Sequence, residues 1–170
     1  PRPGRSADAP PVAAMVARFT PEKGHEVFLH ACARLAREHP SLRVRLAGGG
    51  PLLESMRRLA ADLGIAERTE FAGVVDDIPA FLADAGVFVL PSFTEGLPNA
   101  VIEALLLEVP VVASAVGGVP EIMAHREHGL LVEPGDPEIL AGAIDRLLKD
   151  PDQARRMARA GRERAETVFS

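Results

Sequence analysis

The sequence has little cysteine and no long hydrophobic run. Cys32 is the one cysteine among 170 residues, so the chain by itself builds neither a disulfide framework nor a cysteine-based metal site. Because Cys32 lies in an apolar helical stretch, we expect it in the hydrophobic core. No apolar run approaches the roughly 18 residues of a membrane-spanning helix, and no charged and then apolar leader precedes a cleavage site. These absences predict a soluble, cytoplasmic protein without a membrane span.

An excess of positive charge and several catalytic signatures are also absent. Asp and Glu (24) outnumber Lys and Arg (19), and the net charge of −5 argues against nucleic acid or an anionic membrane as a partner through bulk electrostatics. The histidines lack the spacing to cysteine or carboxylate that a metal site needs. The sequence contains no Gly-x-Ser-x-Gly nucleophile elbow, Gly-x-Gly-x-x-Gly fingerprint or Walker loop. Local basic sites are still compatible with this charge balance.

The composition that is present is ordinary for one globular domain. With 47% hydrophobic and 25% charged residues, the chain is able to bury a sizeable core. Residues 1–11 have linker composition, so we expect a linker or disordered start there and a single domain over residues 12–170. The start without Met suggests a piece of a longer protein, although removal of the initiating Met gives the same start.

Apolar strands alternate with amphipathic helices from residue 12 onward. This alternation predicts crossover units and therefore an α/β fold, a Rossmann-like parallel sheet of about six strands with helices on both faces. The strands are expected at 12–17, 42–47, 69–72, 87–90, 111–114 and 130–132. The helices are expected at 24–38, 52–63, 78–85, 98–109, 120–124, 137–148 and 152–168. Because ligands of such sheets bind outside the carboxyl ends of the strands, the residues after each strand are the candidates for a site.

The stretch 86–103 joins a buried strand to an apolar helix and places two carboxylates near the junction. The helix is apolar on nearly every side, which predicts that it is buried. Glu103 within this helix is costly unless a partner or a cleft receives its charge. Glu95 lies in the turn before the helix, where free N–H groups and the positive end of the helix dipole favour anionic or polar ligands.

The loops after the first and second strands offer further candidates, each with a plainer alternative. Arg18 and Lys23, with Gly24 at a helix start, form either a diphosphate clamp or a pair of surface cations. The three glycines at 48–50 either allow a close backbone approach or simply make a tight turn.

Acidic residues after the third strand and between the last two helices also have two interpretations. Residues 73–75 form an apolar edge suited to an aromatic base, while Asp76 or Asp77 caps the helix that follows. Asp150 and Asp152 have the Asp-x-Asp spacing of metal-dependent sugar transferases, but their place between two helices favours capping. The arginines of the final helix form either a solvated face or a docking surface for a partner domain.

In order and spacing, these features resemble the retaining glycosyltransferases of family 4, the glycosyl transferases group 1. The resemblance covers the chain from residue 12 to its end and implies the C-terminal, donor-binding half of the two-domain GT-B architecture. Two glutamates separated by seven residues are a modest motif alone, but they are highly specific within the ordered set. The matching segments are Arg18 with Lys23 and Gly24, 48–51, Gly73, 89–92, Glu95 and Gly96 with Glu103 and Ala104, 110–114, Gly117 and Gly118 with Glu121, and 129–132.

The resemblance implies a role for each candidate toward a nucleotide-sugar donor. Arg18 and Lys23 hold the diphosphate and stabilise the leaving nucleoside diphosphate, where negative charge grows in the transition state. Glu95 lies against hydroxyls of the sugar, and Glu103 accepts hydrogen bonds from the ribose hydroxyls. Arg18, Lys23 and Glu95 are thus the expected catalytic residues. Other parts of the donor are bordered by Gly96, Leu97, Pro98, Asn99, Gly73, Val74 and Val75.

The resemblance also implies what the chain needs in order to act. The donor is a UDP- or GDP-linked hexose-type sugar, and no metal or other cofactor is implied, because protein cations and helix ends take the place of a divalent ion. The N-terminal, acceptor-binding domain is missing, so we expect weak nucleotide binding and little or no transfer by this chain alone. Action of the whole enzyme at a membrane surface stays open.

Two alternatives and one departure from the family pattern accompany this hypothesis. A nucleotide-binding or structural module without transferase activity would share the sheet and some loops. A sugar-nucleotide epimerase with a related two-domain fold would need further acid and base groups that the sequence does not identify. The family often has a small residue, commonly glycine, near position 108, where this chain has Glu108; this puts the packing at the end of the central helix in question.

Overall fold

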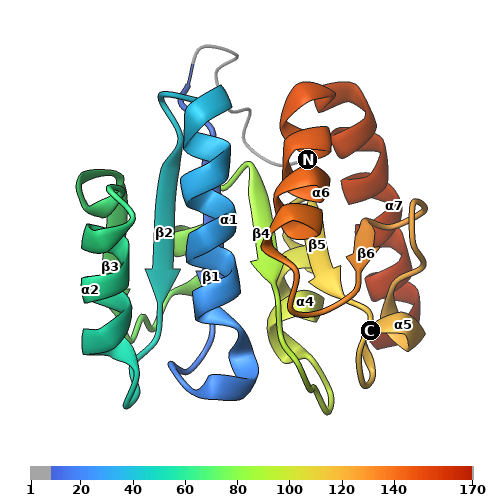
Figure 1. The fold of residues 1–170 in the computed structure, drawn as a ribbon. Coiled ribbons are helices and arrows are strands. Elements are labelled where there is room, and N and C mark those ends of the chain that lie inside the picture. The colour runs from blue at the N-terminus through green and yellow to red at the C-terminus, as the bar shows by residue number, and fades with distance from the viewer. Residues whose placement is uncertain (1–8, 170) are drawn as a thin grey trace.

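Six parallel strands form the sheet at the centre of the protein (Figure 1). The computed structural model describes residues 9–169. The strand order is β3-β2-β1-β4-β5-β6, and every neighbouring pair runs parallel. The strands are β1 (Val12–Val16), β2 (Arg43–Ala47), β3 (Thr69–Gly73), β4 (Val87–Leu90), β5 (Val111–Ser114) and β6 (Leu130–Val132). The predicted parallel sheet is confirmed.

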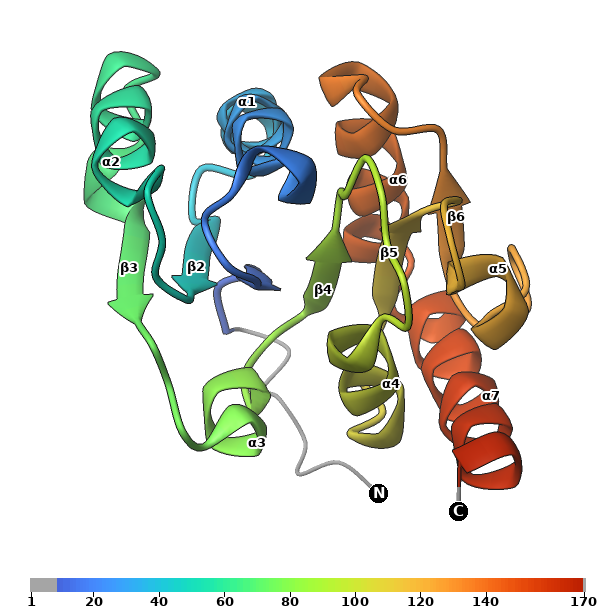
Figure 2. The same ribbon diagram turned by 90° about the horizontal axis from the view of Figure 1, so that it is seen from below.

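Helices cover both faces of this sheet, as expected (Figure 2). α1, α2 and α6 pack on one face, and α3, α4 and α5 pack on the other. The first turns of α7 belong to the first layer and its later turns to the second, so this helix passes from one face to the other. The helices are α1 (His25–Glu38), α2 (Leu53–Asp62), α3 (Ile78–Leu82), α4 (Asn99–Leu106), α5 (Val119–Ile122), α6 (Pro137–Lys149) and α7 (Pro151–Phe169), with 3₁₀ turns η1 (Pro21–Lys23) and η2 (Ala66–Arg68).

The apolar strands place side chains into two hydrophobic cores, one on each face. In β4, Val87 and Val89 pack in the core that includes α1, while Phe88 and Leu90 pack in the core that includes α4. This is the period-two alternation of a strand, with both faces buried as in other parallel sheets. Cys32 is fully buried in the first core, and burial raises the pKa of its thiol, so it is inert packing as predicted.

The central helix differs from expectation in its length and in its burial. α4 ends at Leu106 rather than at residue 109, because Glu108 takes the left-handed conformation, with φ of 58°, and stops the helix. One side of α4 packs in the core, but Asn99, Glu103 and Leu106 form an exposed stripe along the other side. The prediction of a helix buried on nearly every side was therefore wrong, since an apolar Leu106 lies partly in solvent.

The first residues of the chain are only partly described. The linker predicted at 1–11 falls mostly on residues that lie outside the described part. The carbonyl of Pro11 accepts a hydrogen bond from the backbone N–H of Arg43 at 2.8 Å, so pairing with β2 begins just before β1. Across residues 9–169, no helix combines the length and the hydrophobicity that crossing a membrane requires.

The strand order makes a topological switch point between β1 and β4, which we call the crevice because ligands of such sheets bind there. From β1 the chain moves outward to β2 and β3 and then returns to β4, on the other side of β1. The connections after β1 and β4 therefore leave the carboxyl edge in opposite directions. Lys23 and Glu95 come from these two connections.

Candidate functional site

The loops after β1, β2 and β3 contact one another along the carboxyl edge of the sheet. The N–H of Gly48 donates to the carbonyl of Gly73 at 2.7 Å, and the N–H of Phe19 donates to the carbonyl of Gly49 at 2.9 Å. The glycine run at 48–50 thus serves a close approach between loops as well as a turn.

The loops after β1, β4 and β5 continue this edge across the crevice. The N–H of Phe93 donates to the carbonyl of Glu22 at 2.8 Å, and the N–H of Gly118 donates to the carbonyl of Gly96 at 3.2 Å. Backbone hydrogen bonds therefore join the loops that carry the predicted site residues.

The crevice brings Lys23 and Glu95 into direct contact. Nζ of Lys23 lies 2.9 Å from Oε2 of Glu95. Oγ of Ser92 donates a second hydrogen bond to the same carboxylate oxygen at 2.7 Å. The Glu95 side chain is 6% exposed and that of Lys23 is 25% exposed, so the pair is partly shielded from water. A cation and a carboxylate predicted from separate loops are thus neighbours, while their roles toward a donor stay a prediction.

Gly24 allows the two loops of the crevice to meet. It links η1 to α1 in the left-handed conformation, with φ of 78°. A Cβ at this position would lie 2.1 Å from the carbonyl oxygen of Pro91. Glycine is therefore required both for the turn and for the close approach, and this turn positions the neighbouring Lys23.

The other predicted residues lie on both sides of this pair. Arg18 is exposed, and no described residue forms an ion pair with it. Val74 is 80% exposed and its Cγ2 lies beside Gly49, whereas Val75 is half-buried and packs toward the α4 side. Of the apolar edge predicted for a base, Val74 is therefore the side chain open to a ligand, next to the partly buried Gly73.

The start of α4 presents mostly exposed groups beside Glu95. Gly96, Leu97 and Asn99 are exposed, and Pro98 between them is buried. Glu103 lies one turn further along the exposed stripe, and no described residue bonds to its carboxylate. The expectation that Glu103 faces a cleft or a partner rather than the core agrees with this exposure, although its reason, a buried helix, does not hold.

Sequence reasoning missed two residues that support Glu95. Ser92 is completely buried and donates to the carboxylate, as described above. Gly117 has φ of 55°, and a Cβ there would lie 1.8 Å from the carbonyl oxygen of Glu95. A buried serine directly after a strand, at a spacing of three from a carboxylate, was the available signal for Ser92. No local signal points from Gly117 to Glu95, because the contact joins separate loops.

A buried histidine lies directly beside this site. His25, the first residue of α1, is 2% exposed and stacks on Phe19 with the ring centroids 4.1 Å apart. Burial lowers the pKa of His25 to about 4, and the carbonyl of Ala17 opposes this decrease. No hydrogen bond of normal geometry from a described residue reaches either ring nitrogen. The ring is therefore neutral at physiological pH.

A groove of about 480 Å³ runs over the start of α1 toward α2 and α6. Its lining includes Thr20, His25, His30, Met56, Phe93 and Pro137. The groove contains neither Lys23 nor Glu95, so it is not the predicted donor site. It adjoins that site through Gly24.

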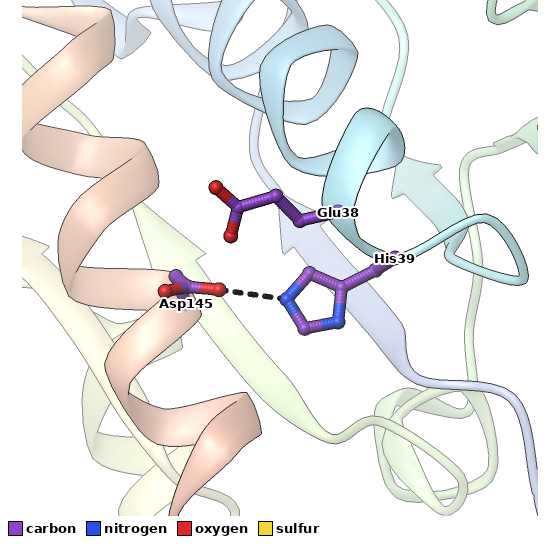
Figure 3. Close-up of side chains that lie close together, drawn as sticks. All are labelled: Glu38, His39 and Asp145. Atoms are coloured by element: carbon purple, nitrogen blue, oxygen red, sulfur yellow. Dashed lines mark hydrogen bonds and ion pairs between the residues drawn. The ribbon is translucent and has the colours of Figure 1, made fainter.

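In the part of the chain that the structure describes, one cluster has side chains that would suit a metal ion (Figure 3). Glu38 and His39 at the end of α1 face Asp145 of α6, with potential ligand atoms within 4.8 Å of one another. Nε2 of His39 lies 2.7 Å from Oδ1 of Asp145, while Nζ of Lys149 lies 3.0 Å from Oδ2 of Asp145 and 3.2 Å from Oε2 of Glu38. Because the Lys149 ammonium already neutralises both carboxylates, the cluster is an ion-pair network that joins α1 to α6, away from the carboxyl edge.

The ion-pair network lowers the pKa of Asp145. Burial would raise the pKa of Asp145, but hydrogen bonds from His39 and Lys149 outweigh burial and lower it.

Two of the acidic residues with alternative interpretations are helix caps. Oδ1 of Asp77 accepts a hydrogen bond from the N–H of Ala80 at 3.0 Å, and Oδ1 of Asp150 accepts one from the N–H of Gln153 at 3.1 Å. Capping is thus confirmed for both residues.

The sheet order defines a Rossmann-like domain, and comparison with known proteins identifies its family. The model of the family described as glycosyl transferases group 1 matches residues 1–164. The chain belongs to this family, family 4 of the glycosyltransferases, and it corresponds to the C-terminal domain of the GT-B fold. The predicted resemblance is confirmed.

Curated relatives are similar over most of this chain. A GDP-mannose-dependent alpha-(1-6)-phosphatidylinositol monomannoside mannosyltransferase of Mycolicibacterium smegmatis is 37% identical over 161 residues, which cover 89% of this chain and 42% of the relative. The lipopolysaccharide core biosynthesis glycosyltransferase LpsE of Rhizobium meliloti is 38% identical, with 96% and 47% covered. The chain spans less than half the length of these relatives.

Solved structures share the fold. Sucrose-phosphate synthase from Thermosynechococcus elongatus superposes with a TM-score of 0.88 at 35% identity, over 98% of this chain and 43% of that one. Anabaena HepE, solved in complex with UDP, gives a TM-score of 0.88 at 26% identity, over 94% and 44%. The C-terminal domain of LpcC from Francisella tularensis, which was solved as a separate domain, has the same fold with a TM-score of 0.86, over 94% and 86% at 23% identity.

Proposed function

We propose that the carboxyl edge between β1 and β4 binds the nucleotide-sugar donor of a retaining hexosyltransferase. The observation that carries this proposal is the contact between Lys23 and Glu95, at 2.9 Å, in a chain that belongs to a glycosyltransferase family. A cation suited to a diphosphate and a carboxylate suited to sugar hydroxyls lie side by side, as the two halves of one donor require.

The residues of the site act by positioning and by stabilising charge. As the bond between the sugar and the diphosphate breaks, negative charge grows on the diphosphate, and Lys23 and Arg18 stabilise it. Lys23 exchanges Glu95 for phosphate oxygens, which its partial exposure and long side chain allow. Glu95 then accepts hydrogen bonds from the sugar hydroxyls.

We assign the nucleoside to residues of α4 and of the loop after β3. Glu103, exposed and free of described partners on α4, accepts hydrogen bonds from the ribose hydroxyls. Val74 presents an apolar side chain to the base, with Gly73 and Val75 next to it. The N-terminal turn of α4 contributes backbone N–H groups toward the sugar and the phosphate.

The relatives support a UDP- or GDP-linked hexose as the donor. The Mycolicibacterium smegmatis relative is GDP-mannose-dependent, and Anabaena HepE was crystallised with UDP and glucose. We propose that the reaction requires neither a metal ion nor a further cofactor. Because the chain covers 42% of the first relative, we also propose that transfer needs a second, acceptor-binding domain that closes over the donor.

Calorimetric titration of the chain with UDP, GDP and ADP tests the donor site. We expect UDP or GDP to bind, and Lys23→Ala to weaken that binding by about tenfold or more, because a charge-assisted hydrogen bond contributes about 1.5–3 kcal/mol. Glu103→Ala is expected to weaken the same binding because it removes the acceptor of the hydrogen bonds from the ribose hydroxyls. Lys149→Ala, which removes a cation of the α1–α6 network, is the matched control and should leave affinity unchanged.

Two results would count against this function. Absence of binding by all three nucleotides contradicts a donor site, and equal weakening by Lys23→Ala and Lys149→Ala contradicts a specific diphosphate contact. Formation of a new sugar nucleotide from the donor alone would instead favour the epimerase alternative.

A further inference from the structure

Ser92 is a fully buried polar side chain whose hydroxyl ends at the candidate site. It follows β4 directly, is 0% exposed and donates from Oγ to Oε2 of Glu95 at 2.7 Å. A hydrogen bond of this length to a carboxylate is a strong one. No described residue other than Glu95 bonds to the Ser92 hydroxyl.

Both partners of the Glu95 carboxylate use the same oxygen. Ser92 Oγ and Lys23 Nζ, at 2.7 Å and 2.9 Å, contact Oε2. No described residue bonds to Oε1. A carboxylate oxygen has two acceptor positions, so this arrangement fixes the carboxylate through one oxygen and leaves the other for an incoming donor group.

The two partners differ in how firmly they are held. The Lys23 side chain is 25% exposed and flexible, and a diphosphate is a stronger partner for its ammonium than one carboxylate oxygen. Ser92 is buried at the end of a core strand, and Gly117 presses against the Glu95 backbone from the loop after β5. When phosphate takes Lys23, Ser92 is the protein partner that still holds the carboxylate.

From this geometry we propose that Ser92 is a positioning residue that orients Glu95 for the sugar half of the donor. It acts through Glu95 and makes no contribution to binding of the nucleoside diphosphate. The inference rests on the proposed function, since Glu95 must meet the sugar for its orientation to matter.

Titration calorimetry with matched ligand pairs tests this role in the chain as it stands. The pairs are UDP with UDP-glucose and GDP with GDP-mannose, and the pair that the wild type binds is used. The quantity compared is the sugar increment, the Kd of the nucleoside diphosphate divided by the Kd of the nucleotide sugar. The variants are Ser92→Ala, Ser92→Cys, whose thiol is somewhat larger than the hydroxyl and a weaker hydrogen-bond donor, and Glu95→Ala alone and combined with Ser92→Ala.

We expect Ser92→Ala and Ser92→Cys to lower the sugar increment about fivefold and to leave the affinity for the nucleoside diphosphate within about twofold, as loss of one hydrogen bond predicts. In the Glu95→Ala background, Ser92→Ala should change the increment no further, because the residue through which it acts is gone.

The remaining outcomes overturn the inference and separate it from the proposed function. If the wild type binds no nucleotide, the proposed function fails and the inference falls with it. If nucleotides bind but Ser92→Ala weakens both ligands of a pair equally, Ser92 is merely structural and the donor site stands. A wild-type increment of one, or an additive loss in the double variant, likewise rejects positioning through Glu95 while leaving the nucleotide site intact.

Discussion

Glu108→Gly should stabilise the protein by about 0.5–1 kcal/mol, because Glu108 occupies a position that favours glycine. Its φ is 58°, and it follows the last turn of α4. The N–H of Glu108 donates to the carbonyl of Leu105 at 2.9 Å, and the N–H of Val109 donates to that of Ala104 at 3.0 Å, which is a Schellman ending. A left-handed residue with a Cβ costs about 1–2 kcal/mol, and glycine loses about 0.5–1 kcal/mol more entropy on folding.

The side chain of Glu108 requires a control, because it lies near a cation. Its Oε1 is 3.9 Å from a guanidinium nitrogen of Arg162, at the limit of an ion pair, and such pairs contribute about 0–1 kcal/mol. Glu108→Ala removes this interaction but keeps a Cβ, so the difference between the glycine and alanine variants isolates the backbone.

Urea denaturation and thermal unfolding of the three proteins measure this difference. We expect the glycine variant to exceed the alanine variant by about 1 kcal/mol, which corresponds to about 2–4 °C in Tm for a chain of this size. A glycine variant no more stable than the alanine variant would show that the left-handed turn at Glu108 carries no strain.

Three further predictions concern the crevice, the buried histidine and the ion-pair network. Gly24→Ala should destabilise the fold by about 2 kcal/mol or more in denaturation, because its Cβ would lie 2.1 Å from the Pro91 carbonyl oxygen, whereas Gly142→Ala, with open space in α6, should be neutral or stabilising. Burial lowers the folded-state pKa of His25 from 6.5 to about 4, so the unfolded state binds more protons between these values and stability should fall as pH falls through this window, by up to about 3 kcal/mol. His25→Phe should remove this component from the pH dependence of urea unfolding, and an unchanged pH slope would contradict it. The pKa of Asp145 is lowered, so its contribution is present above the pKa of an unfolded aspartate and is lost in acid; Asp145→Asn should cost about 1 kcal/mol at pH 7 and a diminishing amount as pH falls below about 4.

The sheet could be predicted from the sequence because β1, β4, β5 and β6 are short, mainly apolar runs and the connections between strands are long enough for a helix. The run Val87–Leu90 is buried on both faces, as its four apolar residues predicted. Helix burial was less predictable, since apolar residues occur on both sides of α4. Leu106 continues the apolar pattern, yet it lies on the exposed stripe with Glu103. Hydrophobic periodicity shows that a helix packs against something, but it does not show where the covering layer ends.

The sequence predicted which residues belong to the candidate site, but it did not predict which of them contact one another. Lys23 and Glu95 were predicted from loops after separate strands, and they are 72 positions apart. Their contact depends on the strand order, which places β1 beside β4, and on Gly24, which lets the loops touch. Ser92 was missed as a functional residue because the sequence does not show which group its buried hydroxyl bonds to; the structure shows that this group is the Glu95 carboxylate.

The exposure of the site residues indicates that this surface is suited to binding a donor but does not exclude water as sugar transfer requires. The side chains of Glu95 and Lys23 are 6% and 25% exposed, so in our proposal the donor meets a partly preorganised carboxylate and cation. Leu97 and Val74, however, are 63% and 80% exposed on either side of the crevice. Transfer of a sugar to an acceptor other than water requires that water be kept from the reacting centre, and a surface this open does not do so. The described surface is therefore suited to hold one side of a donor, and in our proposal a closing second domain supplies the exclusion of water on which transfer depends.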